Sequence, residues 1–138
     1  MMRFLAILTL IFAAPFTAAN AEDEMYSHLV FFELTDKSDD AKQALIDGFE
    51  TYLAPHDGIL VYTASIRDES KQRDVNDLTF DVALTLVFES VAAQDAYQVT
   101  DAHKQFIEEL SGNWASVRVF DSTIPAGSLT IIGGAETE

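Results

Sequence analysis

Tyr97 and His103 are the two side chains of this sequence best suited to acid–base chemistry. They stand six residues apart, on either side of a predicted break between two short helices, so their rings can meet beside one face of a sheet. A neutral imidazole accepts a proton, and a phenol donates a hydrogen bond to a carbonyl oxygen. Such a pair suits enolisation, aldol closure or isomerisation.

The position of His103 in the first turn of a predicted helix affects its protonation. The positive end of the helix dipole disfavours an imidazolium, whereas the nearby carboxylate of Asp101 favours it. The pair also has a structural interpretation, because buried polar groups usually satisfy one another and the two side chains can form a clasp across the helix break. The residues alone leave both interpretations open.

Four further residues, His28, Tyr62, Phe80 and Val82, are candidates for a ligand pocket beside this pair. His28 alternates with Val30 and Phe32 on a predicted strand, so we expect it to be interior, either as a pocket residue or as a hydrogen-bonded core histidine. Tyr62, Phe80 and Val82 lie on later predicted strands and can line the same pocket or fill it. Alternation places Phe80 and Val82 on one face of the third strand. His56 lies in a Pro-His-Asp-Gly turn, which predicts an exposed side chain.

The elements that must position these residues follow the order β-α-β-β-α-β. Apolar alternation predicts strands, helical spacing predicts helices, and Ser38, Ser90 and Thr100 or Asp101 are candidate N-caps. The strands are expected at 27–34, 59–66, 78–88 and 115–121, and the helices at 41–53, 91–97 and from 101 to about 110. This order predicts an α+β, ferredoxin-like plait with an antiparallel four-stranded sheet.

The predicted strands are apolar on both faces, but the helices can cover only one. In the strand at 27–34, Leu29 and Phe31 alternate with the apolar side chains of the other face. An antiparallel sheet with one solvated face should instead alternate between apolar and polar residues. We therefore expect a homodimer in which the sheet pairs with that of a second subunit.

The first residues of the chain have the pattern of a secretory signal peptide. Arg3 precedes an apolar run at 4–16, and Ala19-Asn20-Ala21 is a typical cleavage site. We expect a signal peptide at 1–21, one domain at 22–123 and a tail at 124–138, hence a secreted or periplasmic protein. An uncleaved N-terminal anchor is the alternative, although the apolar run is short for a membrane span.

Charge and cysteine content narrow the range of partners. The chain has a formal net charge of −15, which disfavours nucleic acid and anionic membrane surfaces. The absence of cysteine excludes disulfides and thiolate chemistry. The three histidines have no metal-ligand spacing, and there is no phosphate-binding glycine loop or serine-nucleophile motif. Neither a metal nor a cofactor is predicted.

Several segments together resemble the stress-responsive α/β-barrel (Dabb) domain family, within the wider group of dimeric α+β barrels. The resemblance covers about residues 26–122 and is carried by the segments His28-Leu29-Val30-Phe31-Phe32-Glu33-Leu34, Leu86-Val87-Phe88-Glu89-Ser90, Tyr97 with Ala102-His103-Lys104-Gln105-Phe106, and Val117-Arg118-Val119-Phe120-Asp121. It implies a plait whose sheet pairs with a partner's sheet to form a barrel, in agreement with the expected homodimer.

The resemblance also implies roles for individual residues. Tyr97 and His103 correspond to the catalytic tyrosine and histidine of a plant relative, the olivetolic acid cyclase, and His28 matches its histidine on the first strand. The chain departs from the family at Thr100-Asp101, where His-Pro is common, and at Val82, where the cyclase has a pocket histidine. Other dimeric α+β barrels bind haem, which keeps open a haem site with His103 as axial ligand and Trp114 beside the pocket.

Two functional hypotheses follow. The first is an exported homodimeric domain, non-catalytic or associated with stress, that binds a small apolar or aromatic molecule between sheet and helices. The second is a cofactor-free cyclase or isomerase with His103 as general base and Tyr97 as hydrogen-bond donor. They differ in one geometric requirement: the enzyme needs Tyr97, His103 and His28 to converge on an open cavity.

Overall fold

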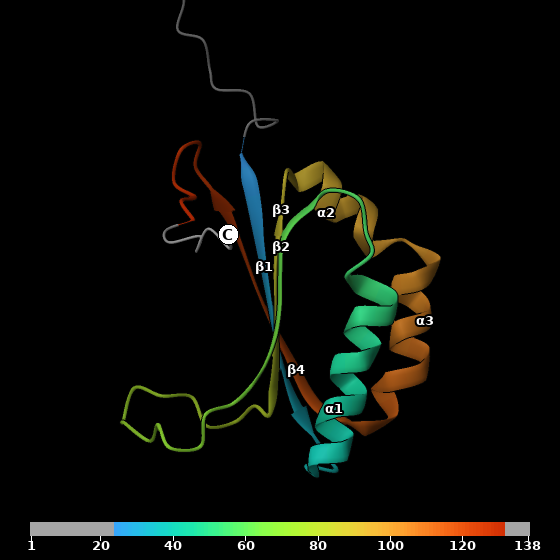
Figure 1. The fold of residues 1–138 in the computed structure, drawn as a ribbon, viewed down its shortest axis with the longest axis vertical. Helices are drawn as coiled ribbons and strands as arrows, with labels where there is room; N and C mark the ends of the chain where they lie inside the picture. Colours follow the sequence, from blue (N-terminus) through green and yellow to red (C-terminus); the bar gives the residue numbers. More distant parts are fainter. Residues whose placement is uncertain (1–23, 132–138) are drawn as a thin grey trace, which may run out of the picture.

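The computed structural model describes residues 24–131 of the chain, which form one four-stranded antiparallel sheet with the helices on one side (Figure 1). The strand order is β2-β3-β1-β4, with β1 at Met25–Leu34, β2 at Ile59–Ile66, β3 at Val82–Phe88 and β4 at Trp114–Ile124. The helices are α1 at Asp39–Gly48, the π-helical turn η2 at Phe49–Leu53, α2 at Val91–Gln98, α3 at Asp101–Leu110 and the short η3 at Ser111–Asn113. The predicted ferredoxin-like fold is confirmed.

Short hydroxyl side chains begin the three α-helices. Ser38 accepts a hydrogen bond from the backbone N–H of Ala41, and Ser90 accepts one from that of Ala93. Thr100, rather than Asp101, caps α3. Each hydroxyl satisfies an N–H that has no partner within its helix, which fixes where the helix begins.

The third strand begins four residues later than its alternation predicts. The chain bends at Asp81, whose buried carboxylate accepts a hydrogen bond from the backbone N–H of Leu34 at 2.8 Å. The bend interrupts the alternation, so Phe80 lies on the opposite face from Val82 and packs against Phe31 with 5.0 Å between ring centroids. The expectation that Phe80 shares a face with Val82 is therefore wrong.

The fourth strand is longer than predicted at both ends. It pairs along the whole of β1, from Met25 opposite Ile124 to Leu34 opposite Trp114. The polar residues Asp121, Ser122 and Thr123 continue the strand because β1 supplies backbone partners for them. Of the predicted tail, residues 125–131 follow β4, whereas the predicted signal peptide and the end of the tail lie outside the described residues.

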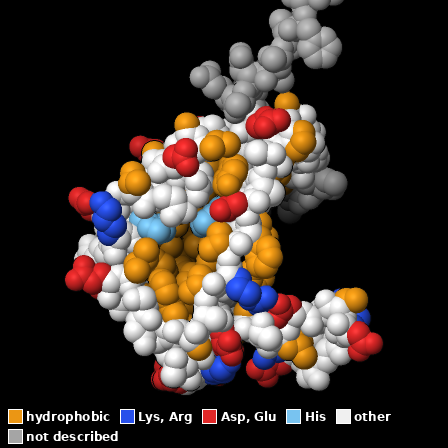
Figure 2. Space-filling view, turned by 180° about the vertical axis from the view of Figure 1, so that it is seen from behind, with side chains coloured by type: hydrophobic (Ala, Val, Ile, Leu, Met, Phe, Trp, Pro, Cys, Tyr) orange, Lys and Arg blue, Asp and Glu red, His pale blue; other side chains and the backbone are white. Residues whose placement is uncertain are grey.

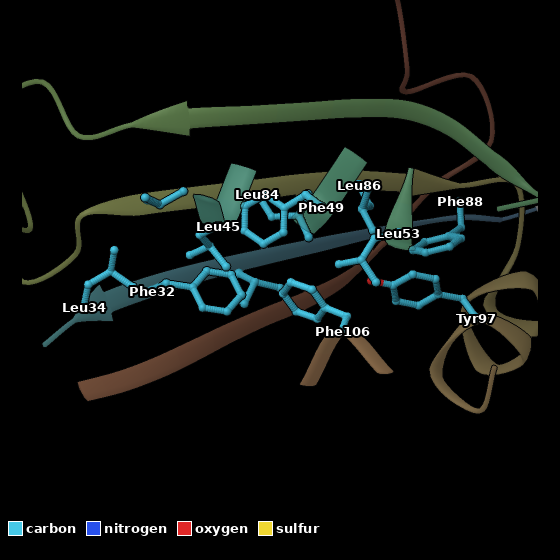
Figure 3. Packing of buried hydrophobic residues seen from close by; sticks show 12 residues of the cluster. Phe32, Leu34, Leu45, Phe49, Leu53, Leu84, Leu86, Phe88, Tyr97 and Phe106 are labelled. Carbon is cyan, nitrogen blue, oxygen red and sulfur yellow. The ribbon is translucent and has the colours of Figure 1, made fainter. Parts of the chain in front are cut away.

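The main hydrophobic core lies between the helices and one face of the sheet, which we call the covered face (Figure 3). Five aromatic rings form much of this core, and Phe32 of β1 contacts Phe49 and Phe106 from the helices. The buried residues of the cluster are Val30, Phe32, Leu34, Leu45, Phe49, Leu53, Val82, Leu84, Leu86, Phe88, Tyr97 and Phe106. This packing fixes α3 and η2 over β1, next to the candidate site.

Within residues 24–131, no helix covers the other side of the sheet, which we call the open face (Figure 1). Its side chains include Leu29, Phe31 and Phe120, and Phe31 stacks edge-on against Phe120 with 5.6 Å between centroids. Phe120 is 52% exposed in the single chain. The loop between β2 and β3 lies on this side, where Asp77 forms an ion pair with Arg118.

Within residues 24–131, no helix is both long enough and apolar enough to cross a membrane.

Candidate functional site

A cavity of about 200 Å³ opens between the covered face and the helices. Figure 2 shows a hollow with an apolar floor and histidine side chains at its rim. The wall combines apolar residues of β1, β4 and α3 with four polar side chains that can exchange or share protons, and its residues are His28, Val30, Phe32, Leu53, Leu84, Tyr97, Gln98, His103, Phe106, Ile107, Trp114, Val117, Val119 and Asp121.

Tyr97 forms the buried end of the polar cluster. It lies in the last turn of α2, is 1% exposed and packs against Phe88 with 5.1 Å between centroids. Its side chain points along the core toward Leu53 (Figure 3). Burial raises the pKa of its hydroxyl above the ordinary value, so the group stays protonated and acts as a donor.

Thr100 builds the break that brings Tyr97 and His103 together. Its hydroxyl donates to the backbone carbonyl of Tyr97 at 2.9 Å and accepts from the backbone N–H of His103 at 3.2 Å. The two rings lie edge to face with 4.8 Å between centroids. The clasp across the break is thus made by Thr100, which leaves the imidazole and the phenol available to the cavity.

The environment of His103 favours a neutral imidazole. Burial lowers its pKa below the ordinary value, and the nearby His28 lowers it further. A neutral ring beside a cavity can accept a proton, as the base hypothesis requires.

His28 both lines the cavity and has a hydrogen-bond partner. Its Nδ1 lies 2.6 Å from a carboxylate oxygen of Asp121, which stands opposite it on β4. A carboxylate at Nδ1 favours the tautomer that carries a proton there and fixes the orientation of the ring. The centroid of the His28 ring is 6.1 Å from that of Tyr97.

Asp121 is the site residue that sequence reasoning missed. The sequence does contain a weak indication of its place. Val117, Val119 and Asp121 alternate on one face of a strand, so the carboxylate of Asp121 is expected on the same face as two apolar side chains. Only the register between β1 and β4 shows that His28 stands opposite it.

His56 lies against Tyr97 and is half-buried, so the prediction of a solvent-exposed side chain is wrong. Their rings are perpendicular, with 5.4 Å between centroids. The turn approaches α2 closely at Gly58, whose φ is +85° and where a Cβ would come within 2.8 Å of the Cβ of Ala93. All three histidines of the chain therefore surround one tyrosine ring.

The remaining predicted pocket residues lie away from the cavity wall. Val82 is fully buried in the core, and Phe80 lies on the open face. Tyr62 packs against the core from β2, and its buried hydroxyl has no hydrogen-bond partner among the described residues. Burial raises the pKa of this hydroxyl.

The cavity does not fit a haem. Its volume of about 200 Å³ is below the range of roughly 300–1,000 Å³ typical of pockets for drug-sized ligands, and a porphyrin is larger than most of those. His103 packs against Tyr97 where an axial ligand would need open space. In the described part of the chain, no three histidine or carboxylate side chains are grouped closely enough to hold a metal ion.

Comparison with known proteins identifies the family to which the fold and the site belong. The model of the stress responsive A/B barrel domain matches residues 27–124. None of the curated proteins is similar enough in sequence to count as a match.

Solved structures with the same fold are similar in architecture but distant in sequence. A Dabb family protein with a ferredoxin-like fold from Mesorhizobium loti is 18% identical, with a TM-score of 0.59, and the match covers 72% of this chain and 95% of that one. A dimeric ferredoxin-like protein of unknown function from Thermobifida fusca is 14% identical (TM-score 0.60; 73% and 92% covered). A hydroxynitrile lyase from Passiflora edulis is 15% identical (TM-score 0.62; 74% and 94% covered).

Proposed function

The chain belongs to the stress-responsive A/B barrel domain family, and we propose that it is a cofactor-independent acid–base enzyme acting on a small carbonyl compound. One observation carries this proposal: Tyr97, His103 and His28 converge on one cavity of about 200 Å³. That convergence is the requirement that distinguishes the enzyme hypothesis from the binding hypothesis, and it makes the enzyme the better-supported of the two.

The residues have complementary roles in enolisation. His103 accepts a proton from the carbon next to the carbonyl group, the C–H electron pair moves toward the carbonyl oxygen, and the Tyr97 hydroxyl donates a hydrogen bond to the resulting enolate. Return of the proton to the same or another carbon gives exchange or isomerisation, and attack of the enolate carbon on a second carbonyl gives aldol closure. His28, oriented by Asp121, is the second group able to move a proton.

The fold is compatible with chemistry of this kind. A hydroxynitrile lyase has the same fold at 15% identity, so the architecture can hold a lyase site for a small molecule. That likeness concerns the fold alone, and the choice of residues rests on the cavity of this chain.

Binding without turnover is the second candidate function. The deep wall of the cavity is apolar and aromatic, with Phe32, Phe106 and Trp114 around it. Such a wall favours a small apolar or aromatic ligand whether or not a reaction follows.

The protein is also proposed to work as a homodimer and to be exported. The exposed side chain of Phe120 on the open face and the dimeric state of a structural relative support the dimer. The pattern of residues 1–21 supports export. Mass spectrometry of the protein secreted by its own cells would test export, because the proposal requires a mature chain that begins at residue 22.

Hydrogen–deuterium exchange into small ketones tests the proposed enzyme. In D₂O, the wild-type protein should accelerate exchange of the α-protons of phenylacetone over buffer, as followed by proton NMR. His103→Gln should reduce the acceleration about 10²–10⁴-fold, because the base is lost. Tyr97→Phe should also reduce it, because the enolate loses its donor.

His56→Gln is the matched control, since His56 contacts Tyr97 but does not line the cavity. It should retain most of the exchange activity. Binding of phenylacetone without accelerated exchange would contradict the enzyme and support the binding hypothesis.

A further inference from the structure

Resting on the proposed function, we propose that the substrate class is uncharged: a ketone or aldehyde with one aromatic ring or a branched aliphatic group. Carboxylates, and thioesters of phosphorylated carriers, are then poor substrates. Three properties of the cavity carry this inference: its size, the absence of cations from its wall, and the nature of its mouth.

The size of the cavity limits the ligand to a small molecule. A dry cavity of about 150 Å³ is enough to bind benzene. The cavity here, at about 200 Å³, therefore accommodates one ring with a short side chain. A linear polyketide chain on a carrier would have to leave most of its length outside.

In the described part of the chain, no lysine or arginine lines the cavity. Among residues 24–131, the only ionisable groups of the wall are Tyr97, His28, His103 and Asp121. The pair of His28 and Asp121 shares one proton between Nδ1 and the carboxylate and carries no net positive charge on whichever of the two that proton lies. A carboxylate that entered would lose its hydration without gaining a counter-ion, which is costly in a site of this kind.

Two cationic groups on the elements that line the cavity are paired with carboxylates outside it. Lys104, next to His103 in the sequence, pairs with Asp101 at 3.5 Å on the surface of α3. Arg118 points to the open face, where it pairs with Asp77. Asp101 in the first turn and the Thr100 cap also offset the positive end of α3.

The mouth of the cavity is apolar and the whole chain is acidic. Val117 and Val119 of β4 and Ile107 of α3 line the cavity and are each at least 39% exposed. The net charge of −15 repels multiply charged phosphates before they reach this mouth. Entry is therefore easiest for a neutral, apolar molecule.

A matched pair of ligands tests the substrate class. Phenylacetone and phenylpyruvate share a benzyl ketone and differ in a methyl group against a carboxylate. Trp114, the only tryptophan of the chain, lines the cavity and reports binding by its fluorescence. Phenylacetone should bind at least about tenfold more tightly than phenylpyruvate, because the carboxylate has no counter-ion in the wall.

Adding one cation at the mouth of the cavity should reduce the preference for phenylacetone over phenylpyruvate. Val119→Lys should strengthen phenylpyruvate binding about fivefold, the size expected for a partly exposed ion pair, with little change for phenylacetone. Val99→Lys is the matched control, since Val99 is 67% exposed and does not line the cavity. It makes the same change in net charge and should alter neither affinity.

The outcomes separate the substrate class from the proposed enzyme. If phenylacetone binds in preference to phenylpyruvate but its α-protons do not exchange, the neutral ligand class stands and the enzyme proposal fails. If phenylpyruvate binds equally well or better, or if neither ketone binds, the inference is overturned. Equal changes in phenylpyruvate affinity in Val119→Lys and Val99→Lys would also overturn the inference, because binding would then not depend on the charge at the cavity.

Discussion

The two faces of the sheet are both apolar, but they differ in what lies against them. The covered face meets α1, η2, α2 and α3, and one end of this interface stays open as a cavity with two histidines, a tyrosine and an aspartate. None of the described helices lies against the open face, whose aromatic residues Phe31, Phe80 and Phe120 form a cluster in the single chain.

This difference shows that apolar character alone does not define a ligand site. The covered face becomes a candidate site because packed helices hold polar groups beside an unfilled volume. The open face has an ion pair at its edge, and the guanidinium of Arg118 holds the pKa of Asp77 well below its usual range. The exposed ring of Phe120, beside the half-buried rings of Phe31 and Phe80, favours contact with another protein surface. Substitutions on each face test whether the covered face holds the core and the site and the open face a contact surface.

The largest expected effect is a loss of stability on the covered face. Phe106→Ala should lower the free energy of unfolding by about 3–5 kcal/mol, because Phe106 is 3% exposed and its removal leaves a cavity among Phe32, Phe49 and Trp114. Urea denaturation followed by circular dichroism measures this loss. A loss below about 1 kcal/mol would mean that the two faces do not differ as described.

A smaller effect is expected on the open face, and it concerns assembly. Phe120→Asp should leave the chain folded but convert the dimer to a monomer, because a charge would be buried at the contact at a cost of about 2 kcal/mol or more. Light scattering combined with size exclusion measures the mass. Val75→Asp, on the exposed loop, is the control and should remain dimeric. A monomeric wild-type protein would contradict the proposed role of the open face.

The smallest effect is a pH dependence that arises on the covered face. The pKa of His103 is lower in the folded chain than its ordinary value of 6.5, so the unfolded chain binds more protons as the pH falls below that value. The neutral ring of His103 therefore contributes its full share of the free energy of unfolding above pH 6.5. This share is lost as the pH falls from 6.5 through the lower pKa that His103 has in the folded chain.

The comparison of wild type with His103→Gln isolates this contribution. Urea denaturation at several pH values should show a shallower decrease in stability for His103→Gln between neutral and mildly acidic pH. Equal slopes for the two proteins would indicate that the His103 ring is as well hydrated in the folded chain as in the unfolded one.

Much of the fold could be predicted because its signals are local. Apolar alternation located β2 at Ile59–Ile66, and hydroxyl residues before helical patterns located the starts of α1 and α2. The start of β3 could not be predicted, because the bend at Asp81 depends on a hydrogen bond to Leu34, which is distant in the sequence.

The candidate site was predictable only in part. Tyr97 and His103 lie close in the sequence, so the helix break was enough to suggest their contact. Asp121 reaches the cavity wall through strand register, and His56 reaches the ring of Tyr97, outside the cavity, through the close approach at Gly58. Phe80, Val82 and Tyr62 were expected in the wall, but alternation does not tell which interior positions border an unfilled volume.

The sequence by itself therefore determined the order of the elements, their caps, the apolar character of both faces and the proximity of Tyr97 to His103. These features depend on neighbouring residues and on the periodicities of helix and strand. The tertiary structure alone decided that His28 pairs with Asp121, that three histidines surround one tyrosine, and that a cavity remains beside them. These features depend on register and on how side chains fill space, which distant segments settle together.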